Sequence, residues 1–218
     1  VVKPVKPSAK MLFRSCQVGV SAFVGEISSG VTTAVFNFII LGLAGNVGVA
    51  AYGVVANTSL VAVAMFNGIS QGSKPLLSEF YGKGNKEKVK KTVWLGLGTA
   101  VVFAFAMIAL VYVGADAIVA VFNSEGNAGL AAYAGTGLRL YFLGFLFAGI
   151  NIVGTGVLSA VEAARWAFIA SVLRGFVAII FCAFVLSFLF GMKGVWLAFP
   201  AAELLTMVVT VTALRKSV

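Results

Sequence analysis

One carboxylate stands out in the 218-residue chain: Glu26 is the single ionisable residue of the long apolar run 18–44. Helical steps of three and four residues from Glu26 reach Ser29, Thr33 and Asn37, so one face of the predicted helix is polar. A carboxylate is costly in lipid and normally faces a bundle interior or a wet cavity that serves an ion or substrate path. We therefore expect Glu26 to lie on such a path. The alternative is a protonated, hydrogen-bonded glutamate that only fixes helix packing.

Glu203 is a second carboxylate within an apolar run, on a common helical face with Thr206 and Thr210. Neither glutamate has a basic residue near its depth on its own predicted helix, and we expect both to lack a cationic partner. Desolvation disfavours the charged form of a carboxyl group, so each could exchange a proton or hold Na⁺ or an organic cation. For Glu203 the alternative is a residue that merely occupies the kink after Pro200.

Neutral polar residues form further stripes on the predicted helices. Asn67 and Gln71 are one helical turn apart, as are Asn151 and Thr155. Buried polar groups in a membrane need partners or water, so the stripes indicate a cavity, with hydrogen bonding between helices as the alternative. The candidates to line that cavity are Ser29, Thr33, Asn37, Asn67, Asn151, Thr155 and Glu203.

No combination of residues predicts catalysis. The chain has no histidine, and Cys16 and Cys182 have neither the spacing nor the placement of a metal site or disulfide. We expect no enzyme activity, no catalytic residue and no cofactor. The one metal ion we would expect is Na⁺ near Glu26.

Composition identifies an integral membrane protein. Hydrophobic residues make up 61% of the chain and charged residues 11%, where soluble domains carry about 25% charged residues. Several apolar runs exceed the roughly 20 residues needed to cross a bilayer. We predict an all-α polytopic protein that folds as a six-helix transmembrane bundle over residues 18–214. The predicted spans are 18–43, 49–71, 92–113, 137–161, 167–190 and 195–214.

The segments outside the spans are short. Residues 1–17 are basic, contain Pro4 and Pro7, and suit a cytoplasmic juxtamembrane linker, while 215–218 form a tail. The second span is expected to end or kink at 71–75, where glycine and proline occur, and 81–91 reads as a lysine-rich turn. Residues 114–136 read as a longer link that contains a short interfacial helix. Because the chain begins without methionine, we expect a piece of a longer protein.

The basic residues predict the orientation. Fourteen of the 16 lysines and arginines, with Arg165 and Arg174 among them, fall on the side of the N-terminus. Basic residues favour the cytoplasmic side, so both termini are expected in the cytoplasm of a multi-pass plasma membrane protein. Membrane topology also accounts for the net charge of +9, and no nucleic-acid partner is predicted.

Several stretches resemble the multidrug and toxic compound extrusion (MATE) transporters, most specifically over residues 18–91. They are Glu26-Ile-Ser-Ser-Gly30, Val49-Ala-Ala-Tyr-Gly53, Phe66-Asn-Gly-Ile-Ser-Gln-Gly-Ser-Lys-Pro-Leu76 and Tyr81-Gly-Lys-Gly84. Such transporters have two six-helix lobes, and this chain resembles the carboxyl-terminal one. The resemblance implies an amino-terminal lobe in the same protein, with the drug-binding cavity between the lobes.

The resemblance also implies a function: export of amphipathic or cationic drug-like compounds in exchange for Na⁺ or H⁺. Glu26 matches the acidic residue that serves cation coupling in the family's seventh helix. Some members add an acidic residue in helix ten, where this chain has Asn151 and Thr155 instead. Five residues near the end of the second predicted span form a motif to which the resemblance gives a gating role: Gln71, Gly72, Pro75, Tyr81 and Gly82.

Two other functions remain open on the sequence. A lipid-linked oligosaccharide flippase of the same superfamily would favour buried lysine and arginine for pyrophosphate, and the predicted spans have none at mid-depth. A passive channel or a structural membrane subunit would need neither a cation gradient nor Glu26.

Overall fold

The computed structural model describes residues 8–218, and within them the side chains at 10–15, 17–22, 24–26 and 29 lie outside the described part. All regular elements of the described residues are helices, which confirms the all-α prediction. Two short irregular helices interrupt the run of α-helices: a 3-10 turn, η1, before α4 and a π-helical segment, η2, before α6. The elements are α1 (Ala9–Gly82), α2 (Lys86–Phe122), α3 (Ala128–Tyr141), η1 (Phe142–Gly144), α4 (Phe145–Ala160), α5 (Ala164–Val172), η2 (Leu173–Val177) and α6 (Ala178–Ser217).

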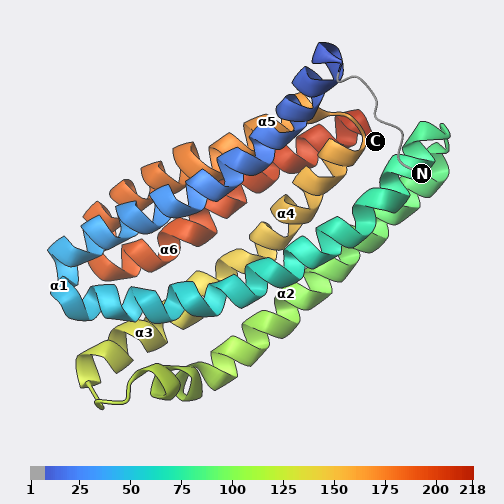
Figure 1. The fold of residues 1–218 in the computed structure, drawn as a ribbon. Helices are drawn as coiled ribbons and strands as arrows, with labels where there is room; N and C mark the ends of the chain where they lie inside the picture. Colours follow the sequence, from blue (N-terminus) through green and yellow to red (C-terminus); the bar gives the residue numbers. More distant parts are fainter. Residues whose placement is uncertain (1–7) are drawn as a thin grey trace, which may run out of the picture.

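Two glycines fold the longest helices back on themselves. Gly45 has φ 62° and ψ −158° within α1, and Gly191 has φ 57° and ψ −136° within α6. A side chain would be strained in this region, which only glycine adopts readily. Each break divides its helix into two limbs. In Figure 1 the chain reverses direction at the break in α1, so that the second limb runs back along the bundle. The chain therefore forms a six-helix bundle, and both breaks fall in gaps between the predicted spans, at 44–48 and 191–194.

Other helix ends differ from the prediction. The second limb of α1 continues through 71–75 and ends at Gly82, so of the expected end or kink at 71–75 the helix end is wrong. A membrane helix tolerates proline because side chains and water satisfy the freed backbone groups, and Pro75 is exposed. The prediction that a link begins at residue 114 is also wrong, because α2 runs unbroken to Phe122. The loop that follows spans only 123–127.

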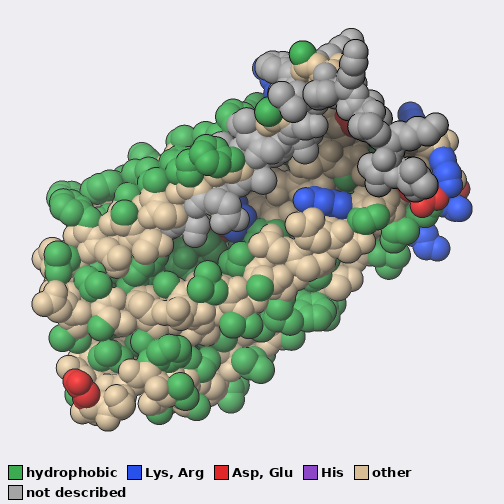
Figure 2. Space-filling view, viewed as in Figure 1, with side chains coloured by type: hydrophobic (Ala, Val, Ile, Leu, Met, Phe, Trp, Pro, Cys, Tyr) green, Lys and Arg blue, Asp and Glu red, His purple; other side chains and the backbone are tan. Residues whose placement is uncertain are grey.

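The helices form two arms joined by α4. In Figure 1 the first limb of α1 lies beside α5 and α6, the second limb of α1 lies beside α2, and α4 crosses between the arms. Figure 2 shows that this face of the molecule is hollowed between the arms, and lysine or arginine side chains lie within the hollow. One end of the bundle, where α1 ends and α2 begins, also gathers basic side chains in that view.

Glycines on α4 and just before it allow this close packing. A Cβ atom at Gly149 would lie 2.7 Å from the Phe66 ring, and one at Gly156 would collide with the Ser70 hydroxyl, both on α1. Small residues let membrane helices approach closely in this way. As a result, 67% of the most apolar stretch of Ala128–Ala160 is buried, against 17% for α2. Four described helices are long and apolar enough to cross a membrane, and large apolar side chains cover their outer faces.

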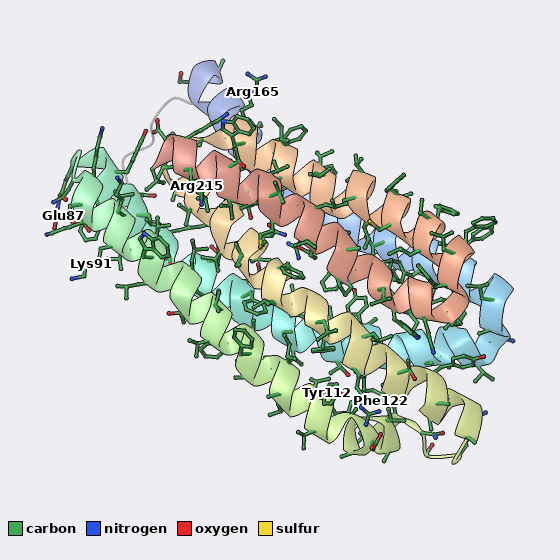
Figure 3. The ribbon with its side chains drawn as sticks, turned by 180° about the vertical axis from the view of Figure 1, so that it is seen from behind. Glu87, Lys91, Tyr112, Phe122, Arg165 and Arg215 are labelled. Carbon is green, nitrogen blue, oxygen red and sulfur yellow. The ribbon has the colours of Figure 1, made fainter. Side chains whose placement is uncertain are left out.

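The two ends of the bundle differ in the side chains that they carry. Figure 3 places Lys91, Arg165 and Arg215 toward one end, and Tyr112 and Phe122 toward the other. These three basic residues, which the sequence assigned to one side of the membrane, thus lie toward one end, although they come from α2, α5 and α6.

Candidate functional site

The best-defined polar site of the described residues surrounds Glu203 on α6. The residue is 2% exposed. One carboxylate oxygen, Oε1, accepts a hydrogen bond of 2.5 Å from Arg174 Nε, and the other, Oε2, accepts one of 2.7 Å from Asn151 Nδ2. Three helical segments, α6, η2 and α4, therefore each contribute one side chain to a single buried cluster, which we call the Glu203 cluster (Asn151, Arg174 and Glu203).

Asn151 is the neutral member of the cluster and is fully buried. Its Nδ2 donates to the Glu203 carboxylate and also to the Glu203 main-chain carbonyl at 2.8 Å. The opposite placement of the amide would put Oδ1 against two other acceptors, so the hydrogen bonds fix which atom is nitrogen. Oδ1 consequently points away from Glu203, and it is the one buried polar side-chain atom of the described residues without a hydrogen-bond partner.

Arg174 supplies the positive charge from the π-helical segment η2. Its side chain is 26% exposed and is the accessible member of the cluster. At 1.5 Å per residue, Arg174 lies about 14 Å along the helix from Arg165, which starts α5. Its assignment to the basic end of the bundle was therefore wrong. The expectation that Glu203 lacks a cationic partner was wrong as well, because the partner comes from a neighbouring helix.

The cluster borders a wall of aromatic side chains. Tyr141 stacks on Phe199 with ring centroids 4.2 Å apart, and Phe36 contacts both Tyr141 and Tyr52. Tyr141 also interacts electrostatically with Glu203 and Arg174. The wall comes from α1, α3 and α6.

The other predicted cavity residues are spread along α1 and α4. The side chains of Glu26 and Ser29 lie outside the described residues. Thr33 forms a side-chain hydrogen bond with Tyr52, Asn37 is half-buried and Asn67 is exposed. Thr155 donates to the main-chain carbonyl of Asn151 on its own helix, at 2.8 Å. The structure therefore brings Asn151 and Glu203 together and leaves Thr33, Asn37, Asn67 and Thr155 outside their cluster.

The predicted gating motif lies along the second limb of α1. Gln71, Gly72 and Pro75 are exposed on that helix, and Tyr81 and Gly82 form its last turn. Ser70 and Lys74, on the buried side of the same stretch, contact α4 at Gly156. The contact between these helices is thus made by residues that the motif did not include.

Sequence reasoning missed Arg174, the partner of Glu203. The signal was a lone arginine at the eighth residue of the predicted apolar span 167–190, because an ionisable residue at membrane depth faces the protein interior and has a partner. The described residues contain no group of three histidine, cysteine, aspartate or glutamate side chains that could hold a metal ion. The Glu203 cluster itself offers carboxylate, amide and main-chain oxygens.

The chain is similar to multidrug export proteins along most of its length. It is 30% identical over 204 residues to the multidrug export protein MepA of Staphylococcus aureus (strain bovine RF122 / ET3-1) and 32% identical over 203 residues to MepA of Staphylococcus haemolyticus (strain JCSC1435). Each alignment covers 93% of this chain and 44% of the relative, so the chain spans less than half the length of these proteins.

Solved MATE structures share the fold. An outward-facing MATE family transporter of the MOP superfamily superimposes with a TM-score of 0.89 at 16% identity, covering 99% of this chain and 50% of that one. An inward-facing structure gives 0.85 at 17% identity, covering 97% and 50%. The six-helix bundle is thus one lobe of a MATE-type transporter. Residues 22–185 match the family model described as MatE, and the chain belongs to the MatE family.

Proposed function

We propose that this chain is the carboxyl-terminal lobe of a multidrug exporter that moves amphipathic or cationic compounds out of the cell in exchange for Na⁺ or H⁺. The observation that carries the proposal is the 30–32% identity to multidrug export proteins over 93% of the chain. The polar interior supports the same function. A charged cluster at membrane depth costs stability, so it is retained where ions or substrates pass.

The proposed mechanism is alternating access. The lobe fold matches both an outward-facing and an inward-facing transporter, with TM-scores of 0.89 and 0.85. This agreement supports a lobe that keeps its shape while it rocks against an amino-terminal lobe in the same protein. The hollowed face in Figure 2 is the proposed contribution of this chain to the central cavity.

Glu26 is the proposed coupling residue, and Ser29, Asn37 and Asn67 are proposed neighbours on the substrate path. The proposed setting is the plasma membrane, with both termini and the basic end of the bundle in the cytoplasm. Gln71, Gly72, Pro75, Tyr81 and Gly82 are proposed to act at the cytoplasmic gate, as parts of one helical limb. No cofactor and no catalytic residue enter this mechanism.

Reconstitution of the complete transporter tests the proposal. Vesicles that hold a fluorescent cationic dye should export it when an inward Na⁺ or H⁺ gradient is applied. Glu26→Gln should abolish export and leave insertion into the membrane intact, whereas the exposed Glu125→Gln should behave as wild type. Undiminished export by Glu26→Gln would remove Glu26 from the mechanism. Dye movement that ignores both gradients would indicate a channel.

The flippase alternative gains little from the structure. Arg174 does lie at membrane depth, contrary to the sequence analysis, but its charge is already paired with Glu203. Tighter binding of a lipid-linked oligosaccharide than of any cationic dye would nevertheless favour the flippase.

A further inference from the structure

We propose that Glu203 and Asn151 form a cation site whose resident ligand is the Arg174 guanidinium, and that an incoming hard cation, H⁺ or Na⁺, takes its place during transport. The inference rests on the proposed function, since it assigns a part of the cation exchange to a cluster separate from Glu26. In this proposal Arg174, which is part of the lobe, competes with the incoming cation for the Glu203 carboxylate.

The first observation concerns access. Glu203 and Asn151 are 2% and 0% exposed, while 26% of the Arg174 side chain is accessible. Asn151 is also held by two hydrogen bonds, one of them to the main chain of α6. Arg174 uses Nε for Glu203. The arginine is therefore the member of the cluster that can leave without dismantling the core.

The second observation concerns the segment that carries Arg174. Leu173–Val177 is π-helical, contains no buried residue and joins α5 to α6. Such segments interrupt regular helical hydrogen bonding and are frequent at functional sites. Gly175, the next residue, packs under Ser28 of the first limb of α1, which is the limb that carries Glu26. Movement of that limb would thus act directly on the backbone that positions Arg174.

The third observation concerns the ligands that remain when Arg174 withdraws. Glu203 would keep one hydrogen bond from Asn151 and would leave a buried charge that requires a cation. The donor that Arg174 vacates is the carboxylate oxygen Oε1 of Glu203. Asn151 Oδ1, which has no partner in this structure, points away from that carboxylate and would add a second oxygen once the amide group turns. Oxygen ligands suit hard cations, and a carboxylate equally takes a proton.

The charged and titratable groups around Glu203 are few among the described residues. Arg174 faces it from η2 and Tyr141 from α3, and α4 presents the neutral Asn151. Tyr141 lies in the aromatic wall. The balance of charge at the site is consequently set by Arg174 and by whichever cation replaces it.

Titration of transport by the complete transporter tests the competition. With wild type and Arg174→Gln in vesicles, dye export is measured against Na⁺ at fixed pH and against pH without Na⁺. If Arg174 leaves the site in about a tenth of the molecules, its removal should lower the half-saturating cation concentration about tenfold. The double variant Arg174→Gln/Glu203→Gln should lose that gain. An unchanged half-saturating concentration in Arg174→Gln, or an identical gain in the double variant, would overturn the proposal.

Direct binding covers the case in which Arg174→Gln fails to assemble. Purified wild type and the uncharged Arg174→Gln/Glu203→Gln pair are compared for saturable ²²Na⁺ binding and for proton uptake on acidification. Loss of one ²²Na⁺ site in the double variant identifies Na⁺ as the ligand, and loss of one proton identifies H⁺. Equal binding of both cations by the two proteins would refute the site, even if gradient-driven export by wild type upheld the proposed function. Conversely, absence of gradient-driven export would refute the proposed function and leave this binding result standing.

Discussion

Gly156 of α4 lies directly against Ser70 of α1, so closely that a Cβ atom at position 156 would overlap the serine hydroxyl. The Lys74 stem lies beside them, 3.4 Å from that Cβ position. The contact joins the second limb of α1 to the helix at the centre of the lobe. Addition of one methyl group at position 156 tests it.

Gly156→Ala should therefore destabilise the lobe by about 1–3 kcal/mol, the usual cost of overpacking. The measurement is the free energy of unfolding in mixed micelles. Gly98→Ala is the matched control, because Gly98 of α2 has no atom within 4 Å of its added Cβ. Ser70→Ala should rescue part of the loss. Equal stability of Gly156→Ala and Gly98→Ala would show that the two helices are not in contact here.

Asn151→Ala should cost about 1.5–3 kcal/mol, the range for a hydrogen bond to a charged group. The alanine would leave the Glu203 carboxylate with Arg174 as its one partner. Asn57 provides the comparison, because it is exposed and donates to the Gly53 carbonyl of its own helix. Unfolding of Asn151→Ala and Asn57→Ala at the same denaturant concentration would argue against the Glu203 cluster.

The two backbone breaks make a separate prediction. Gly45→Ala and Gly191→Ala should each cost about 1–3 kcal/mol, since their positive φ places a side chain in strain. Neither position has an atom within 4 Å of an added Cβ, so the cost would come from the backbone alone. The melting temperature of the purified transporter reports the effect, with the helical Gly53→Ala as control. A Gly45→Ala protein as stable as Gly53→Ala would mean that the turn tolerates ordinary residues.

The proposed orientation, with the basic end of the bundle in the cytoplasm, predicts which positions can be labelled from outside the cell. After Cys16 and Cys182 are replaced by alanine, single Glu87→Cys and Glu125→Cys variants report opposite ends. A membrane-impermeant maleimide should label position 125 in intact cells and position 87 in inverted vesicles. Basic residues retained in the cytoplasm are the physical reason. Labelling of position 87 in intact cells would reverse the proposed topology.

The sequence predicted the features that depend on local chemistry. The breaks at Gly45 and Gly191 were expected because glycine lies between two apolar runs, and both occur. Pro75 was misjudged because a proline at an exposed position in a long membrane helix removes one backbone hydrogen bond without ending the helix. Local patterns therefore located the turns better than the helix ends.

The partnership of Arg174 with Glu203 could not be read from either residue's own helix. The two are 29 positions apart and meet because η2 and α6 pack side by side. Counting basic residues by side of the membrane placed Arg174 with Arg165, although the helix carries it well into the bundle. Asn151, by contrast, was identified as a cavity candidate from the sequence. Its hydrogen bonds to Glu203 explain why a polar side chain is buried at that position.

The central position of α4 limits how the lobe can deform. That helix contacts α1, α2 and α6 at once, and its glycines set the spacing to two of them. Sliding of the second limb of α1 or of α6 past α4 would have to break one of these close contacts. The helices packed against α4 would therefore move together as one rigid unit. Larger displacements would occur between this unit and the surface that faces its hollow side.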